Sequence, residues 1–100
     1  MILTPQAERL IDHAIRDLNR EAQEKWRLWL AQPGPKHLAP DVAEVVLDAL
    51  RLVQARLEDY LANPNLSEDE EADMLNDLGY VRAIRGDLLG EVAPRRAAAG

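Results

Sequence analysis

The sequence predicts an all-α protein, an antiparallel bundle of about three helices. Apolar residues recur at intervals of three and four along three segments, which places them on one face of a helix. Prolines and capping residues separate these segments. The 100 residues are enough for one domain. We assign this domain to 1–90 and a flexible C-terminal tail to 91–100.

The first helix is expected at 5–32. Thr4 can cap its N-terminus, and Pro5 suits the first helical position, where no N–H is needed. At the usual rise per residue this helix would be about 42 Å long, against about 30 to 33 Å for the other two. We therefore expect either a bend around Asn19 or a projecting end that packs against another chain.

The second helix is expected at 40–62, after a Pro-Gly-Pro turn at 33–35 that ends the first. Its apolar residues, from Val42 to Leu61, occupy more than one face. Such a helix is expected at the centre of the fold, in contact with more than one neighbour. The width of its apolar surface also predicts that oligomerisation completes the core.

The third helix is expected at 68–89. Ser67 and Glu70 form a capping-box pattern at its start. Acidic residues in its first turns and arginines near its end match the helix dipole. Glycines near Leu89 weaken the helix there, and the remaining residues resemble a frayed tail.

Composition excludes several functional classes. The formal charge of −6 disfavours nucleic acid and anionic membranes as partners. Cysteine is absent, which removes disulfides, thiolate metal sites and cysteine nucleophiles. No signal peptide or run of 18 apolar residues is found, so we expect a cytoplasmic protein. The excess of Arg over Lys and the abundance of Ala and Leu resemble GC-rich bacterial or phage coding.

No catalytic motif is present, so we expect no enzyme, no cofactor and no metal site. The single serine, Ser67, already serves as a helix cap. His13 and Asp17 have the i,i+4 spacing of two metal ligands, but two ligands do not make a site. His37 lies in the proline-rich connection and receives no role.

Two groups of residues are candidates for binding a partner or ligand. The first is Lys25, Trp26, Arg27 and Trp29, since tryptophan and arginine are common interface anchors. Core packing is the favoured interpretation of the two indoles. The alternative is that an exposed indole stacks on a nucleotide while the cations hold its phosphates.

The second group is acidic and consists of Glu68, Asp69, Glu70 and Glu71. Solubility and the helix dipole explain these charges most simply. The functional alternative is a surface that docks onto Arg and Lys of a partner protein.

These observations favour a small acidic protein-interaction module that sequesters a partner. A bacterial or phage inhibitor, immunity protein, antitoxin or adaptor would fit this description. The partner is expected to be another protein, a second copy of the chain, or both. The alternative is an oligomeric small-ligand binder that captures a nucleotide-like anion through Trp, Arg and Lys.

Overall fold

The computed structural model describes residues 3–34 and 37–99, with side chains up to Gly90. Within these ranges the chain forms four helices and no strand: α1 Pro5–Ile15, α2 Arg20–Leu30, α3 Pro40–Leu61 and α4 Glu68–Ala99. The predicted all-α class is confirmed. The expected number of about three helices is corrected to four, because the first predicted helix is two helices.

The interruption between α1 and α2 lies at Asn19. The backbone of Asn19 is extended, with φ −72° and ψ 166°, and its side-chain Oδ1 accepts a hydrogen bond from the Ala22 N–H at 2.8 Å. An asparagine that caps a new helix in this way cannot also lie inside a continuous one. The single helix expected at 5–32 is therefore wrong, and the predicted bend around Asn19 is the outcome.

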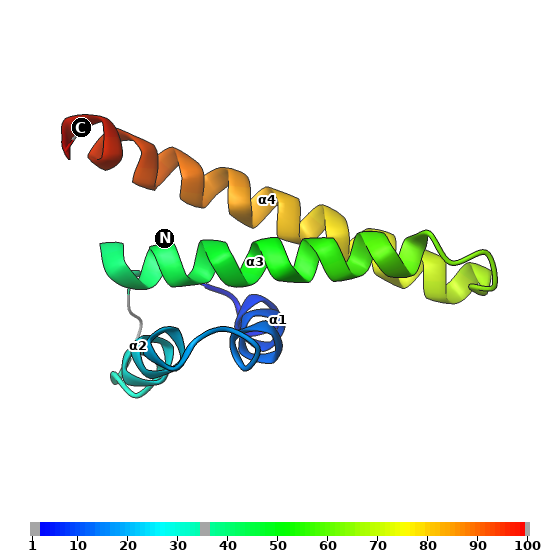
Figure 1. Cartoon of the computed structure of the whole chain (residues 1–100), viewed down its shortest axis with the longest axis horizontal. Helices are drawn as coiled ribbons and strands as arrows, with labels where there is room; N and C mark the ends of the chain where they lie inside the picture. Colours follow the sequence, from blue (N-terminus) through cyan, green and yellow to red (C-terminus); the bar gives the residue numbers. More distant parts are fainter. Residues whose placement is uncertain (1–2, 35–36, 100) are drawn as a thin grey trace.

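Helix α3 is the central element of the fold. It contacts each of the other three helices, and its most extensive contact is with α4. Figure 1 shows α4 running antiparallel along one side of α3, while α1 and α2 cross the opposite side and are seen nearly end-on. The wide apolar surface expected for this helix therefore has neighbours within the same chain.

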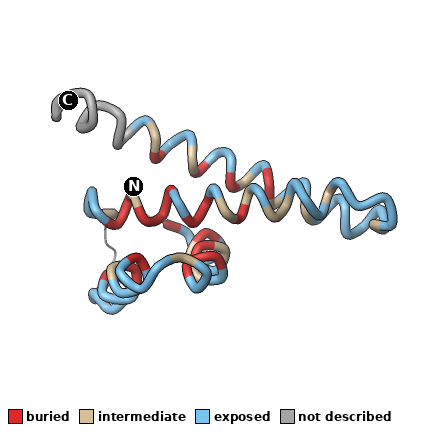
Figure 2. The backbone as a smooth tube through the Cα atoms, in the orientation of Figure 1, coloured by how far each residue is buried: buried red, intermediate tan, exposed pale blue. Residues whose placement is uncertain are grey.

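The buried residues other than Leu78 form one apolar cluster to which all four helices contribute. The largest fully buried side chains are Trp26, Ile11, Leu47, Leu50, Leu88, Val46 and Val81. Figure 2 shows that burial is concentrated where α3 lies between α4 and the α1–α2 pair. Because one chain covers this part of α3, the width of its apolar surface does not require a second copy. Oligomerisation remains a prediction.

The helix ends follow local chemistry in most cases. Gly34 adopts a positive φ of 74°, which the turn after α2 requires and which glycine tolerates. Ser67 Oγ accepts a hydrogen bond from the Glu70 N–H at 3.2 Å, so one half of the predicted capping box is present. The backbone of α4 stays helical to Ala99, beyond the end predicted at Leu89. The flexibility expected of 91–100 remains a prediction.

The hairpin of α3 and α4 extends beyond the part of the molecule that α1 and α2 cover. The molecule is elongated, with extents of 44 × 29 × 25 Å. The connection between α3 and α4 lies at one end of the long axis, and residues there are mostly exposed (Figure 2). The fold therefore has a packed base and a projecting hairpin end.

Candidate functional site

The two tryptophans are core residues. Trp26 and Trp29 are each 2% exposed, and their rings stack with centroids 5.3 Å apart and an interplanar angle of 23°. Trp26 Nε1 donates to Asp12 Oδ1 at 3.2 Å, and Trp29 Nε1 donates to the His37 carbonyl at 3.1 Å. The indoles thus join α2 to α1 and to the segment before α3, as buried tryptophans with satisfied N–H groups commonly do. Neither indole face is open to a ligand.

The two cations beside the tryptophans lie outside the core. Lys25 Nζ pairs with Glu21 Oε1 at 3.3 Å within α2. Lys25 also lines a hollow of about 290 Å³ at the α2–α3 connection, next to the exposed Leu28. Arg27 lines a different groove, on the other side of α2. The fold therefore separates the four residues that the sequence grouped together.

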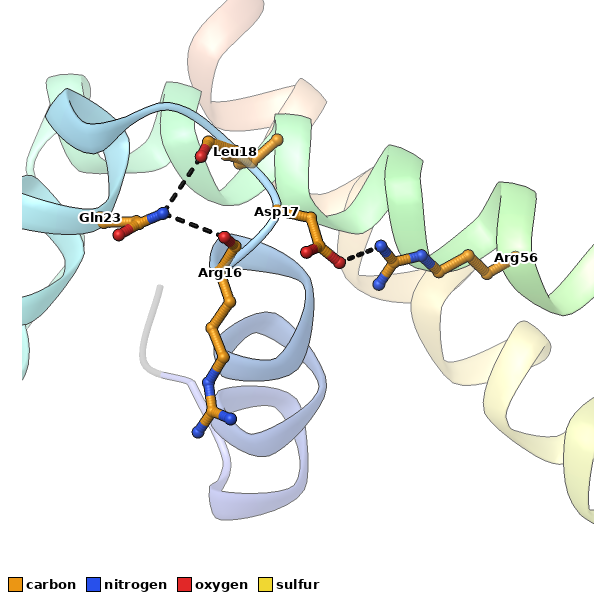
Figure 3. A network of polar contacts seen from close by, with 5 residues as sticks. All are labelled: Arg16, Asp17, Leu18, Gln23 and Arg56. Atoms are coloured by element: carbon orange, nitrogen blue, oxygen red, sulfur yellow. Dashed lines mark hydrogen bonds and ion pairs between the residues drawn. The ribbon is translucent and has the colours of Figure 1, made fainter.

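Polar contacts hold the connection between α1 and α2 in place (Figure 3). The Gln23 Nε2 amide donates to the carbonyl oxygens of Arg16 and Leu18, at 3.0 and 3.1 Å. Asp17 forms an ion pair with Arg56 of α3. The Arg16 side chain extends away from α3 in the same view, whereas Asp17 points toward it. These contacts fix the angle between α1 and α2 and turn Arg16 outward.

A groove of about 450 Å³ lies between α1 and α2. Three arginines line it, Arg16, Arg20 and Arg27. Its other lining residues are Asp12, Ile15, Gln23, Glu24, Trp26 and Leu30. Arginine side chains around a partly apolar floor suit carboxylate groups, since guanidinium binds carboxylates in bidentate geometry. We call this feature the arginine groove.

The projecting end of the hairpin carries most of the negative charge. Residues 57–77, which we call the acidic tip, contain eight Asp and Glu residues and no Lys or Arg. Their formal charge is −8 against −6 for the whole chain, so the remaining residues sum to +2. The predicted acidic group, Glu68, Asp69, Glu70 and Glu71, is exposed and lies at the start of α4 within this tip. The other residues whose side chains the structure describes carry nine acidic and nine basic groups, so the net negative charge is concentrated at this end.

Apolar side chains are exposed within the acidic tip. Tyr60 is 57% exposed and Leu75 is 51% exposed. A hollow of about 360 Å³ lies beside the Tyr60 ring and is lined also by Arg56, Asp59 and Asn63. The acidic tip therefore carries two large apolar side chains, one on α3 and one on α4, among its carboxylates.

Where the tip joins the base, α3 and α4 are linked by polar contacts. Glu58 Oε1 accepts hydrogen bonds from the Gln54 amide at 3.0 Å and from Arg82 at 3.5 Å. The Gln54 hydrogen bond, then that of Arg82 and its positive charge, lower the pKa of the Glu58 carboxyl below its ordinary value of 4.5. Arg85 also bonds to Gln54. This network marks the boundary between base and tip.

The histidines show no sign of a metal site. His13 and His37 are exposed, and Asp17 is occupied by Arg56. Among the side chains described within residues 3–34 and 37–90, no three of His, Asp or Glu converge in a way that could hold a metal ion. In the same part of the chain, no helix has the length and apolar character needed to cross a bilayer.

The fold defines the chain as a small all-helical protein, and comparison with known proteins adds no narrower class. No family model, curated protein or solved structure matches the chain. Its function must therefore be argued from its own surfaces.

The sequence suggested Glu68, Asp69, Glu70 and Glu71 of the tip as a candidate surface, whereas the arginine groove was not predicted. Arg16 and Arg20 lie four residues apart in the single helix predicted at 5–32, where they would be neighbours on an exposed face and would not border a groove. The available signal was Asn19 followed by an acidic residue at position 21, a pattern typical of a helix start.

Proposed function

We propose that the protein is an interaction module whose acidic tip docks a basic, amphipathic segment of a partner protein. The carrying observation is the combination of eight carboxylates, no cation and exposed apolar side chains on one projecting end. In a bacterium or phage such a module would act as an inhibitor, immunity protein, antitoxin or adaptor by sequestering its target. Binding requires no chemistry from the chain, so the proposal is of a binding protein and not an enzyme.

The apolar residues of the tip supply what charge alone does not. Glu68, Glu71 and Ala72 precede Leu75 by seven, four and three residues, so they share its face of α4. Burying Leu75 against a partner would remove apolar area from water, a gain of about 25 cal/mol per Å². The surrounding carboxylates would select a basic partner and steer its approach. A segment with Lys or Arg around a Leu or Ile stripe fits this face.

The small-ligand alternative has lost its main support. It required an exposed indole for stacking, and both indoles are buried against each other and their hydrogen-bond partners. Lys25 and Arg27 line different cavities. No arrangement of the four predicted residues therefore favours capture of a nucleotide-like anion.

The test uses a fluorescently labelled helical peptide of Leu and Lys with apolar residues at three-and-four spacing. Its affinity for the full chain is measured by anisotropy at low and moderate salt. Neutralising the tip by Glu68→Gln, Asp69→Asn, Glu70→Gln and Glu71→Gln together should weaken binding at least about tenfold, since each exposed ion pair contributes up to about 1 kcal/mol.

A matched control neutralises four carboxylates outside the tip, by Glu8→Gln, Glu21→Gln, Asp41→Asn and Asp48→Asn. It changes net charge by the same amount and also removes acidic residues from first helical turns. Circular dichroism confirms that both variants stay helical. Equal affinity of the two variants, or failure of the unmodified chain to bind the peptide, contradicts the proposal.

A further inference from the structure

We propose that the arginine groove between α1 and α2 receives the acidic tip of a second copy, so that the protein associates head to tail. This inference rests on the proposed role of the tip as a docking surface. It adds a partner, the chain itself, and a receiving site that the sequence did not indicate.

The groove carries the arginine side chains that the acidic tip lacks. Arg20 and Arg27 lie two helical turns apart on α2, and Arg16, the C-cap residue of α1, lines the same groove. The apolar lining comes mainly from the partly buried Leu30, because Ile15 and Trp26 line the groove but are only 3% and 2% exposed. The groove can therefore receive an apolar side chain flanked by carboxylates.

The two acidic residues of the groove do not cancel its positive charge. Asp12 already accepts the Trp26 N–H and pairs with Arg16 at 3.5 Å. Its charge is therefore engaged within the chain. Of the charged residues that line the groove, Arg20 and Arg27 face only Glu24 as a further carboxylate. The groove is net positive.

The first turns of α4 present a face that is complementary to the arginine groove. Leu75 is 51% exposed and shares its face with Glu68 and Glu71. Ala72 and Gly79, three residues before and four after Leu75, lie on the same face. A Cβ placed at Gly79 would meet nothing within 4 Å, so this face is open. Small residues beside Leu75 allow the helix to approach a groove closely.

The contact must form between copies. Helices α1 and α2 lie across α3 from α4, and the acidic tip is at the end of the long axis, beyond both of them (Figure 1). The tip cannot reach the groove of its own chain. Each copy has one tip and one groove, which gives either a reciprocal dimer or a head-to-tail series.

The polarised charge makes this contact favourable despite the net charge of −6 on each copy. At physiological ionic strength charges are screened beyond about 8 Å. Charges on distant parts of two copies therefore repel only weakly. The carboxylates of a docked tip and the arginines of the groove lie within that distance and attract.

The experiment is sedimentation velocity of the full chain at tens of micromolar concentration. The unmodified chain should sediment as a dimer or larger species. The groove variant, Arg20→Glu with Arg27→Glu, and the tip variant, Glu68→Lys with Glu71→Lys, should each weaken association about tenfold or more. Lys25→Glu with Arg51→Glu makes the same charge change as the groove variant, outside the groove, and should leave association unchanged.

Mixing the groove and tip variants provides the sharpest result. The intact tip of one can occupy the intact groove of the other, and the two altered surfaces again have opposite charges, so the mixture should form one-to-one assemblies that neither variant forms alone. Circular dichroism establishes that both variants are folded. A mixture that stays monomeric, or a control that dissociates like the groove variant, overturns the inference.

The two proposals fail separately. If the basic peptide binds the tip but the unmodified chain is monomeric, head-to-tail association is wrong and the proposed function stands. If the chain associates through tip and groove but no basic peptide binds, the proposed function is wrong. If both hold, the peptide should compete for the tip and release monomers.

Discussion

Replacing Asn19 by alanine tests whether residues 5–32 form two helices or one, because the two arrangements predict opposite signs. In the structure Asn19 caps α2 through the 2.8 Å bond from Ala22 N–H. Loss of such a cap costs about 1 kcal/mol of folding free energy. In a continuous helix, by contrast, Asn is less favourable than Ala by up to about 0.7 kcal/mol, so the same substitution would stabilise.

The size of the expected loss follows from the surroundings of Asn19. Gln23 also holds the Arg16 and Leu18 carbonyls, so the interruption has a second support that persists in the variant. We therefore expect Asn19→Ala to lower the free energy of unfolding by about 1 kcal/mol, and not by the larger amounts seen for some caps. In a domain of this size a loss of about 1 kcal/mol lowers the midpoint of thermal unfolding by about 4 to 8 °C.

The assay is urea unfolding followed by circular dichroism, with thermal unfolding as a second measurement. Asn76→Ala is the matched control, because Asn76 is exposed inside α4 and the change should be neutral or slightly stabilising there. If Asn19→Ala stabilises the protein as Asn76→Ala does, the separation of α1 from α2 is refuted. The geometry of the arginine groove would then be refuted with it.

Three further measurements test the core, the tip and the network between them. Leu50→Ala should lower the free energy of unfolding by about 2 to 5 kcal/mol because Leu50 is fully buried. Leu75→Ala should change the free energy of unfolding little but should weaken binding of the basic peptide. Equal losses of stability in the two variants would contradict the burial pattern. The tryptophan pair should show blue-shifted emission that mononucleotides do not alter, and a saturable response to a nucleotide would revive the small-ligand alternative. The folded-state pKa of Glu58 is depressed, so its contribution is present above the ordinary pKa of 4.5 and is lost as pH falls through the lower folded value. The stability difference between the unmodified chain and Glu58→Gln should therefore shrink in that acidic range, and a difference that is constant with pH would contradict the network.

The periodicity of apolar residues was sufficient to predict the helical class and the central place of α3, and the capping pattern of Ser67 and Glu70 predicted the start of α4 at Glu68. It could not locate the end of α1, because the apolar stripe continues through Leu18 to Ala22 in either arrangement. The end of α1 depends on tertiary contacts, namely those of Asp17 with Arg56 and of Gln23 with the Arg16 carbonyl. Such contacts cannot be seen in local propensity.

The candidate surfaces likewise differ in how far the sequence predicts them. The acidic tip is a run of charge in the sequence and needed only the hairpin to place it at one end. The arginine groove joins Arg16 of α1 with Arg27 of α2 across the break at Asn19. Their spacing would place them on one face even of a continuous helix, but it predicts an exposed stripe and not the second wall of a groove. The tryptophan pair was ambiguous because an amphipathic stripe predicts which face of a helix is apolar but does not identify the neighbour that covers it.

The separation of a packed base from a projecting tip has a consequence for motion and for tolerance to sequence change. Backbone amides in the first half of α3 lie between helices on both sides, so they should exchange with solvent only on global unfolding, whereas those at the tip should exchange through local opening. Substitutions at the tip should likewise leave the folded population unchanged while altering which partners the surface binds. The protein can therefore acquire a new target through changes in the acidic tip (57–77) while the base keeps its fold.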